Sequence, residues 1–272
     1  MGKKRNIHFF IKAKKKRQKI SAITAYDYNT SVLASQAGID LILVGDSLGM
    51  VIQGRENTIP VTLDQMIYHT RLVTRARPDS FVVGDMPYGS YHVSLDESRQ
   101  NALRFIKEGG AQAVKLEGGQ KRFHTIQALL DIEIPVLGHL GLTPQSIHQL
   151  GGFKIQGKLK RKAEQIHRDA LAMEKMGVFA IILEAIPEKL GREISRSLKI
   201  PTIGIGAGRF CDGQILVMND VIGLSTTGYI PSFARRYADV GAAIRQSLEH
   251  YVRDIQAGDF PAPAETYPTG KP

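Results

Sequence analysis

Side chains suited to acid–base or metal chemistry stand at or near the ends of six different apolar segments. They are Asp27, Asp46, Asp85, Glu117, His139 and Glu184. In parallel α/β proteins the carboxyl ends of the strands meet on one face, and the active site is built there. One such acid is often only a helix cap. The same placement on so many segments favours a shared site.

Two of these acids point to a cation. If Asp46 and Asp85 face inward on neighbouring strands, two carboxylates lie a few ångströms apart. Such a pair must either raise a pKa or bind a positive charge. Oxygen ligands favour a hard ion, Mg²⁺ above all, and the single cysteine, Cys211, argues against a thiolate zinc site. The alternative is that Lys115 alone compensates the acidic pair.

Each of the remaining candidate residues is compatible with more than one chemical role. Lys115 and Glu117 are two residues apart on an expected strand, so they project together. Lys115 is a counter-ion, a handle for an anionic substrate or a Schiff-base lysine. His139, in LGHLG, fits a buried core position as well as a substrate contact. Glu184 follows the apolar run AIIL, where partial desolvation would raise its pKa toward that of a general base; a structural ion pair is the alternative.

Short Val- and Ile-rich runs that alternate with helix-like stretches must position these residues. The alternation predicts an α/β protein with a parallel sheet, and eight strands fit a (β/α)8 TIM barrel. An open, doubly wound sheet is the alternative. The expected strands cover residues 21–28, 39–46, 81–87, 113–119, 134–141, 179–186, 200–208 and 213–220, and expected helices include 62–77, 94–108, 161–176, 187–198 and 232–258.

The chain has 272 residues, and its net charge of +10 is concentrated at one end. Nine lysines and arginines precede Asp27, the first acidic residue. We therefore expect a basic, mobile N-terminal arm (1–20), one barrel domain (21–260) and an irregular tail (261–272). The arm is either a solvated segment or a tether to polyanions or membranes. The lone cysteine and the lack of a signal or membrane-spanning run predict a cytoplasmic protein.

Several segments together resemble the ketopantoate hydroxymethyltransferase family. They run in order along nearly the whole chain beyond the arm: ITAYDY, LVGDSLGM, PVTLDQMIYHT, GDMPYGSY, VKLEGG, PVLGHLGLTPQS, GGFKIQGK, ILEAIP, IGIGAG and CDGQILVMND. The resemblance implies a (β/α)8 barrel that transfers a hydroxymethyl unit from 5,10-methylenetetrahydrofolate to 3-methyl-2-oxobutanoate, yielding 2-dehydropantoate. It also implies a homodecamer, with no nucleic-acid or membrane partner.

By the same resemblance, motif residues acquire roles. Asp46 and Asp85 correspond to Mg²⁺ ligands that also adjoin the substrate, with Glu117 at the ion. The resemblance assigns keto-acid contacts to Ser47, Lys115 and His139, and proton abstraction to Glu184.

Two other functions compete with this interpretation. One is a Mg²⁺-dependent lyase or mutase of the isocitrate lyase and phosphoenolpyruvate mutase type, although lyases of that group use a loop cysteine. The other is a nucleic-acid binder that works through the arm. Deletion of residues 1–19 is expected to leave an enzyme active and to abolish salt-dependent binding by the arm.

Overall fold

Eight parallel strands close into a barrel in this computed structural model, which describes residues 4–224 and 230–267. Each strand pairs with its neighbours in chain order, and β1 also pairs with β8. This confirms the predicted (β/α)8 architecture and excludes the open sheet. The strands are β1 (Ile20–Thr24), β2 (Leu41–Val44), β3 (Phe81–Asp85), β4 (Ala113–Glu117), β5 (Val136–Gly141), β6 (Ala180–Glu184), β7 (Thr202–Ile205) and β8 (Gly213–Leu216).

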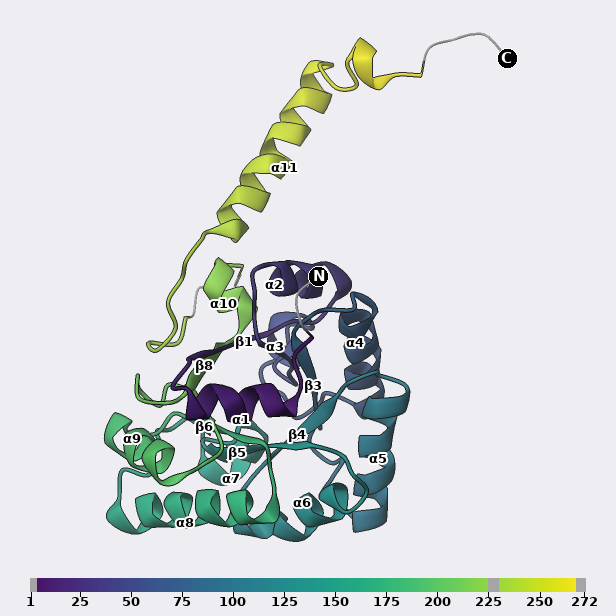
Figure 1. Cartoon of the computed structure of the whole chain (residues 1–272). Helices are drawn as coiled ribbons and strands as arrows, with labels where there is room; N and C mark the ends of the chain where they lie inside the picture. The colour runs from purple at the N-terminus through teal and green to yellow at the C-terminus, as the bar shows by residue number, and fades with distance from the viewer. Residues whose placement is uncertain (1–3, 225–229, 268–272) are drawn as a thin grey trace. The chain divides into compact units, whose positions relative to one another are not determined.

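Helices form a ring around the barrel (Figure 1). The ring helices are α2 (Tyr28–Gln36), α4 (Leu63–Arg75), α5 (Leu95–Lys107), α6 (Phe123–Leu130), α8 (Lys160–Met176) and α9 (Glu188–Ser197). The short helices are α3 (Leu48–Val51), α7 (Ile147–Leu150) and α10 (Met218–Ile222). The 3-10 turns are Gln120–Arg122 and Pro144–Ser146 and, near the C-terminus, Pro263–Glu265. No helix separates β7 from β8, which departs from full β/α alternation.

The capping chemistry that the sequence contains sets several helix starts. Thr62 and Gln65 form a reciprocal capping box at the start of α4, and Ser94 accepts a hydrogen bond from the Glu97 backbone at the start of α5. Asp27 likewise caps α2, because its carboxylate accepts from the Thr30 backbone N–H at 2.9 Å. Asp27 is therefore a helix cap and does not join the other rim acids.

The lysine-rich N-terminal segment differs from the expected mobile arm. Residues Ile7–Lys15 form helix α1, which lies across the barrel in Figure 1. Phe10 on this helix is fully buried, with its ring centroid 5.3 Å from Phe81 and 5.7 Å from Phe179. Both partners stand at the beginnings of strands, so α1 closes the amino-terminal end of the barrel. Deleting residues 1–19 would remove core packing as well as charge.

The chain divides into two compact units, with the boundary after Met218. The first unit contains α1 and the barrel. The second unit contains helix α11 (Val240–Ala257), and no residue of this helix is buried. Within the described ranges, no helix is both long enough and apolar enough to cross a bilayer.

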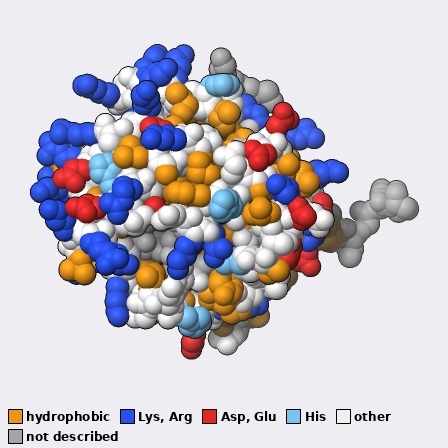
Figure 2. Space-filling view, turned by 90° about the horizontal axis from the view of Figure 1, so that it is seen from below, with side chains coloured by type: hydrophobic (Ala, Val, Ile, Leu, Met, Phe, Trp, Pro, Cys, Tyr) orange, Lys and Arg blue, Asp and Glu red, His pale blue; other side chains and the backbone are white. Residues whose placement is uncertain are grey.

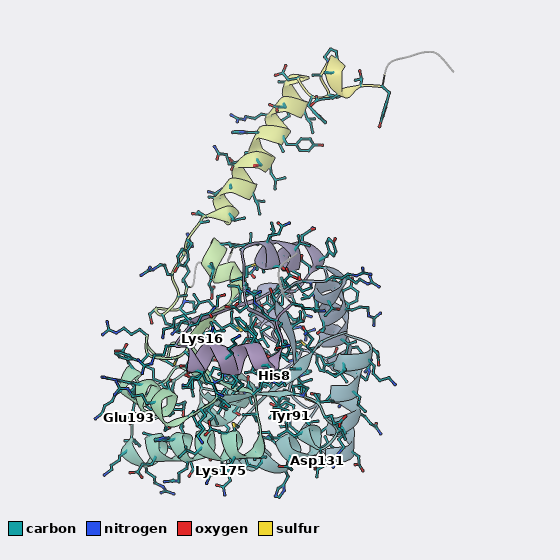
Figure 3. All side chains as sticks on the ribbon, in the orientation of Figure 1. His8, Lys16, Tyr91, Asp131, Lys175 and Glu193 are labelled. Carbon is teal, nitrogen blue, oxygen red and sulfur yellow. The ribbon has the colours of Figure 1, made fainter. Side chains whose placement is uncertain are left out.

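Charge on the outer surface is uneven. Figure 2 shows one face on which lysine and arginine side chains gather toward one margin. Figure 3 shows Lys175 and Glu193 on the outside of the helix ring, whereas Tyr91 lies within it. Tyr91 is buried and belongs to the polar cluster described next.

Candidate active site

A buried polar cluster occupies the carboxyl ends of strands β2 to β6. Strand register brings its members together, since Asp85 pairs with Lys115 and Glu117 pairs with His139 across adjacent strands. Five of its residues are almost fully buried: Asp46, Asp85, Lys115, Glu117 and His139. The structure therefore gathers five of the six rim residues expected from the sequence and leaves out only Asp27.

Lys115 stands between two carboxylates. Its Nζ donates to Asp85 Oδ1 at 2.9 Å, to Asp85 Oδ2 at 3.0 Å and to Glu117 Oε1 at 3.1 Å. Burial lowers the pKa of Lys115, but Asp85, Glu117 and Asp46 outweigh that effect and raise it well above the usual value. Lys115 is thus held as a cation, which opposes a Schiff-base role because that chemistry needs a neutral amine.

Asp46 forms its hydrogen bonds with Asp85 and Gln145 rather than with Lys115. Its backbone N–H donates to Asp85 Oδ2 at 3.1 Å, and its side chain accepts from Gln145 Nε2 at 2.9 Å. Burial and the nearby Asp85 charge raise the pKa of Asp46 well above the usual value. Burial likewise raises the pKa of Asp85, although Lys115 opposes the shift. A cation placed beside Asp46 and Asp85 would relieve this excess of negative charge.

These two aspartates fit a divalent hard cation, because Mg²⁺ commonly takes one or two protein carboxylates and completes its shell with substrate oxygens and water. Across residues 4–224 and 230–267, no three His, Cys, Asp or Glu side chains are grouped to hold an ion by themselves. Glu117 accepts hydrogen bonds from Lys115 at 3.1 Å and from the Gln145 backbone N–H at 3.0 Å.

His139 bridges two carboxylates. Its Nδ1 lies 3.5 Å from Glu117 Oε1, and its Nε2 lies 3.2 Å from Glu184 Oε2. Both contacts are within ion-pair distance, and neither has hydrogen-bond alignment. Burial and Lys115 lower the pKa of His139, but the two carboxylates raise it to about 9. Burial raises the pKa of Glu117, and Lys115 and His139 bring it down to about 2.

Glu184 is the most open member of the cluster, with 16% of its side chain exposed. Gly141 on β5 allows the backbone beside it to approach closely. A Cβ at Gly141, where φ is +99°, would lie 2.2 Å from the Glu184 carbonyl oxygen. Glycine is therefore required there, and it sets β5 against the end of β6 where Glu184 faces His139.

Ser47 follows Asp46 and lies beside Tyr26, with its Oγ 2.9 Å from the Tyr26 hydroxyl. It precedes α3 without capping that helix through its side chain. Its hydroxyl is thus held near the carboxyl end of β2 by a contact from the end of β1. This position suits a contact to a ligand bound beside Asp46.

Gln145 and Tyr91 complete the cluster, and neither is predicted from the sequence. Gln145 Nε2 donates to Asp46 and to the Met86 carbonyl, each at 2.9 Å, and its Oε1 accepts from the Tyr91 hydroxyl at 2.5 Å. Tyr91 in turn accepts from the Glu117 N–H at 3.2 Å. An uncharged side chain in a loop belongs to no helix or strand periodicity, so the hydrophobic pattern does not reveal it. The sequence feature that could have pointed to these two residues is their position in the motifs GDMPYGSY and GLTPQS.

Fold and site together define a TIM-barrel protein with a charged, cation-compatible cluster where such barrels place their active sites. A profile of the ketopantoate hydroxymethyltransferase family matches residues 4–263. The chain belongs to that family.

Relatives with a named activity align with this chain over nearly its full length. The chain is 51% identical over 249 residues to a 3-methyl-2-oxobutanoate hydroxymethyltransferase of Syntrophomonas wolfei, covering 92% of this chain and 90% of that protein. It is 50% identical over 267 residues to one from Pelobacter propionicus, covering 98% of each. Among solved structures, a phosphonopyruvate hydrolase has a TM-score of 0.61 at 13% identity, covering 97% of this chain and 92% of that one. A 2,3-dimethylmalate lyase has a TM-score of 0.59 at 15% identity, covering 96% and 91%. These two structures share the fold.

Proposed function

We propose that this protein transfers a hydroxymethyl group to 3-methyl-2-oxobutanoate, forming 2-dehydropantoate. The donor is 5,10-methylenetetrahydrofolate. The C3–H bond of the keto acid breaks, C3 bonds to the donor's methylene carbon, water supplies the hydroxyl oxygen, and tetrahydrofolate leaves. The observation that carries the proposal is the buried set of Asp46, Asp85 and Lys115 at the strand ends, which matches a keto acid that must lose a carbon-bound proton.

The metal in this proposal is Mg²⁺, held by Asp46 and Asp85. When bound, it polarises the carbonyl of a 2-oxo acid that chelates it, which acidifies the C3–H bond. We expected Glu117 as a further ligand. Its contacts instead favour an indirect role, in which Glu117 holds Lys115 and His139 in place beside the ion.

Four residues of the chain supply charge stabilisation, substrate contacts and proton abstraction. The Lys115 ammonium lies where it stabilises negative charge that develops on the substrate, and Ser47 offers a hydroxyl to the keto acid. His139 borders the substrate and keeps a positive charge beside Glu184. Glu184, as a carboxylate, accepts the C3 proton, a step for which a positioned base contributes roughly 10²- to 10⁴-fold in rate.

The strand-end cluster also bears on the competing lyase. A cysteine-dependent lyase needs its thiol near the substrate. Cys211 is buried just before β8, and the neighbouring Lys19 donates to its carbonyl ahead of β1. Strand beginnings lie at the end of the barrel opposite the cluster. This placement supports transfer over cysteine-dependent cleavage.

The deciding experiment follows hydrogen exchange at C3 of 3-methyl-2-oxobutanoate in deuterated water by NMR, without any folate. The proposal requires exchange that depends on both enzyme and Mg²⁺, and turnover to 2-dehydropantoate once methylenetetrahydrofolate is added. Exchange at the uncatalysed rate with Mg²⁺ present would reject it. Exchange without turnover would reject the donor but keep the proton step.

We further propose that the protein is a cytoplasmic homo-oligomer, a decamer by family resemblance. Support comes from α11, where Ile244, Leu248, Tyr251 and Ile255 recur three or four residues apart and are 45 to 58% exposed. Such spacing forms one apolar stripe, which suits a second copy of the chain. Light scattering on the intact protein and on Leu248→Asp tests this, since a charge on the stripe should lower the mass.

A further inference from the structure

A cavity of about 360 Å³ opens beside the cluster. Tyr91, Glu117 and Gln145 belong both to its wall and to the cluster. Its other walls are the loop after β4, the segment after β5, and the side of α8 that carries Gln165 and Asp169. The volume lies in the usual range for small-molecule sites.

The proposed reaction needs such a space. A carbon–carbon bond forms only when the donor carbon reaches contact distance of C3, so the donor must enter a volume that is continuous with the keto-acid site. Because Glu117 and Gln145 are shared between cluster and cavity, a ligand in the cavity lies next to the charged cluster.

The wall of the cavity formed by α8 presents a carboxylate. Asp169 Oδ1 accepts from Gln165 Nε2 at 2.8 Å, and Oδ2 packs against Gly119 so closely that a Cβ there would lie 1.9 Å away. Asp169 is half-buried. A half-buried carboxylate in a cavity suits a ligand with adjacent N–H donors, because it can accept two parallel hydrogen bonds.

The rest of the cavity lining includes two aromatic rings and two basic side chains. The Tyr91 and His92 rings lie 4.2 Å apart, centroid to centroid, and Arg122 stands over Tyr91 at 5.6 Å. Burial and the Arg122 charge lower the pKa of His92 to about 4, so this ring is neutral at pH 7. Lys121 is exposed beside them. Planar rings and ligand carboxylates are thus both accommodated.

We propose that this cavity binds the one-carbon donor, with Asp169 accepting from the 2-amino and N3–H edge of its reduced pterin and with Lys121 facing its glutamate carboxylates. The inference rests on the proposed function and adds to it the place of the second substrate. Asp169 acts here in binding, because it takes part in none of the hydrogen bonds of Asp46, Asp85 and Lys115.

The test is Asp169→Asn, with Glu164→Gln as the matched control on the exposed side of the same helix. The KM for methylenetetrahydrofolate should rise roughly tenfold or more in D169N, as expected when hydrogen bonds to a charged acceptor are weakened. The KM for the keto acid and the folate-independent C3 exchange should match wild type, and E164Q should match it throughout.

An unchanged donor KM, or equal rises for both substrates, would overturn the assignment. Calorimetry with 5-formyltetrahydrofolate provides a direct measure, and it should show weaker binding to D169N. If D169N does not fold, Lys121→Ala decides, because it is exposed: its donor KM must rise, and more for a donor with several glutamates. Wild type that shows neither C3 exchange nor turnover would reject the proposed function instead.

Discussion

Replacing Lys115 with Met removes the positive charge from the centre of the cluster while keeping much of the side-chain volume. Lys115 is 4% exposed, and its partners Asp85 and Glu117 are each 2% exposed by side chain. Removing one partner of a buried ion pair leaves an unpaired buried charge and costs about 3–5 kcal/mol. We expect a loss of that size in the free energy of unfolding near pH 8.

The loss should depend on pH with a definite sign. Without Lys115, burial holds the pKa values of Asp85 and Glu117 above their unfolded values of roughly 4. An acid whose folded pKa is raised destabilises the fold as the pH rises above its unfolded pKa. The loss in unfolding free energy of the variant should therefore be small near pH 4 and reach its full size at neutral pH. Mg²⁺ should reduce this loss, because it replaces the missing positive charge.

Urea unfolding of wild type and Lys115→Met at several pH values, with and without Mg²⁺, measures these effects. The control is Lys175→Met, an exposed lysine on α8. A loss below about 1 kcal/mol near pH 8 would refute the reasoning, since that is the size expected of a surface pair. So would a loss that does not change with pH.

Further predictions address other parts of the molecule. Glu184→Gln should slow C3 exchange by roughly 10²-fold or more while titration still shows keto-acid binding; an unchanged exchange rate would remove Glu184 as the base. Asp85→Ala should abolish Mg²⁺-dependent activity, and wild-type turnover would contradict its role as ligand. For His139, the raised pKa of about 9 stabilises the fold below its unfolded value of 6.5, and this stability is lost as the pH rises through 9. His139→Asn should flatten that fall in the unfolding free energy, and an unaltered pH profile would count against the charged form. Phe10→Ala should cost about 3–5 kcal/mol, as core phenylalanines do, whereas a mobile arm would show no change in denaturation.

The sequence alone determined the barrel and most of the charged cluster. The apolar runs that end in Asp46, Asp85, Glu117 and Glu184 predict both the strands and the acids of the cluster. A parallel strand that is buried on both faces is continuously apolar, and polar residues occur only at its end. Local capping patterns also fixed the starts of α4 and α5. Such features depend on neighbours in the chain, so they can be recognised without a fold.

The tertiary structure decided what depends on distant partners. Nine basic residues made the N-terminal segment look solvated, yet Phe10 packs against Phe81 and Phe179, and that burial outweighs the surrounding charge. Asp27 satisfied the same pattern as Asp46, but only backbone geometry shows that it caps a helix. Gln145 joins the site because its loop folds over strands that lie far away in sequence, and no local pattern encodes contacts of that range.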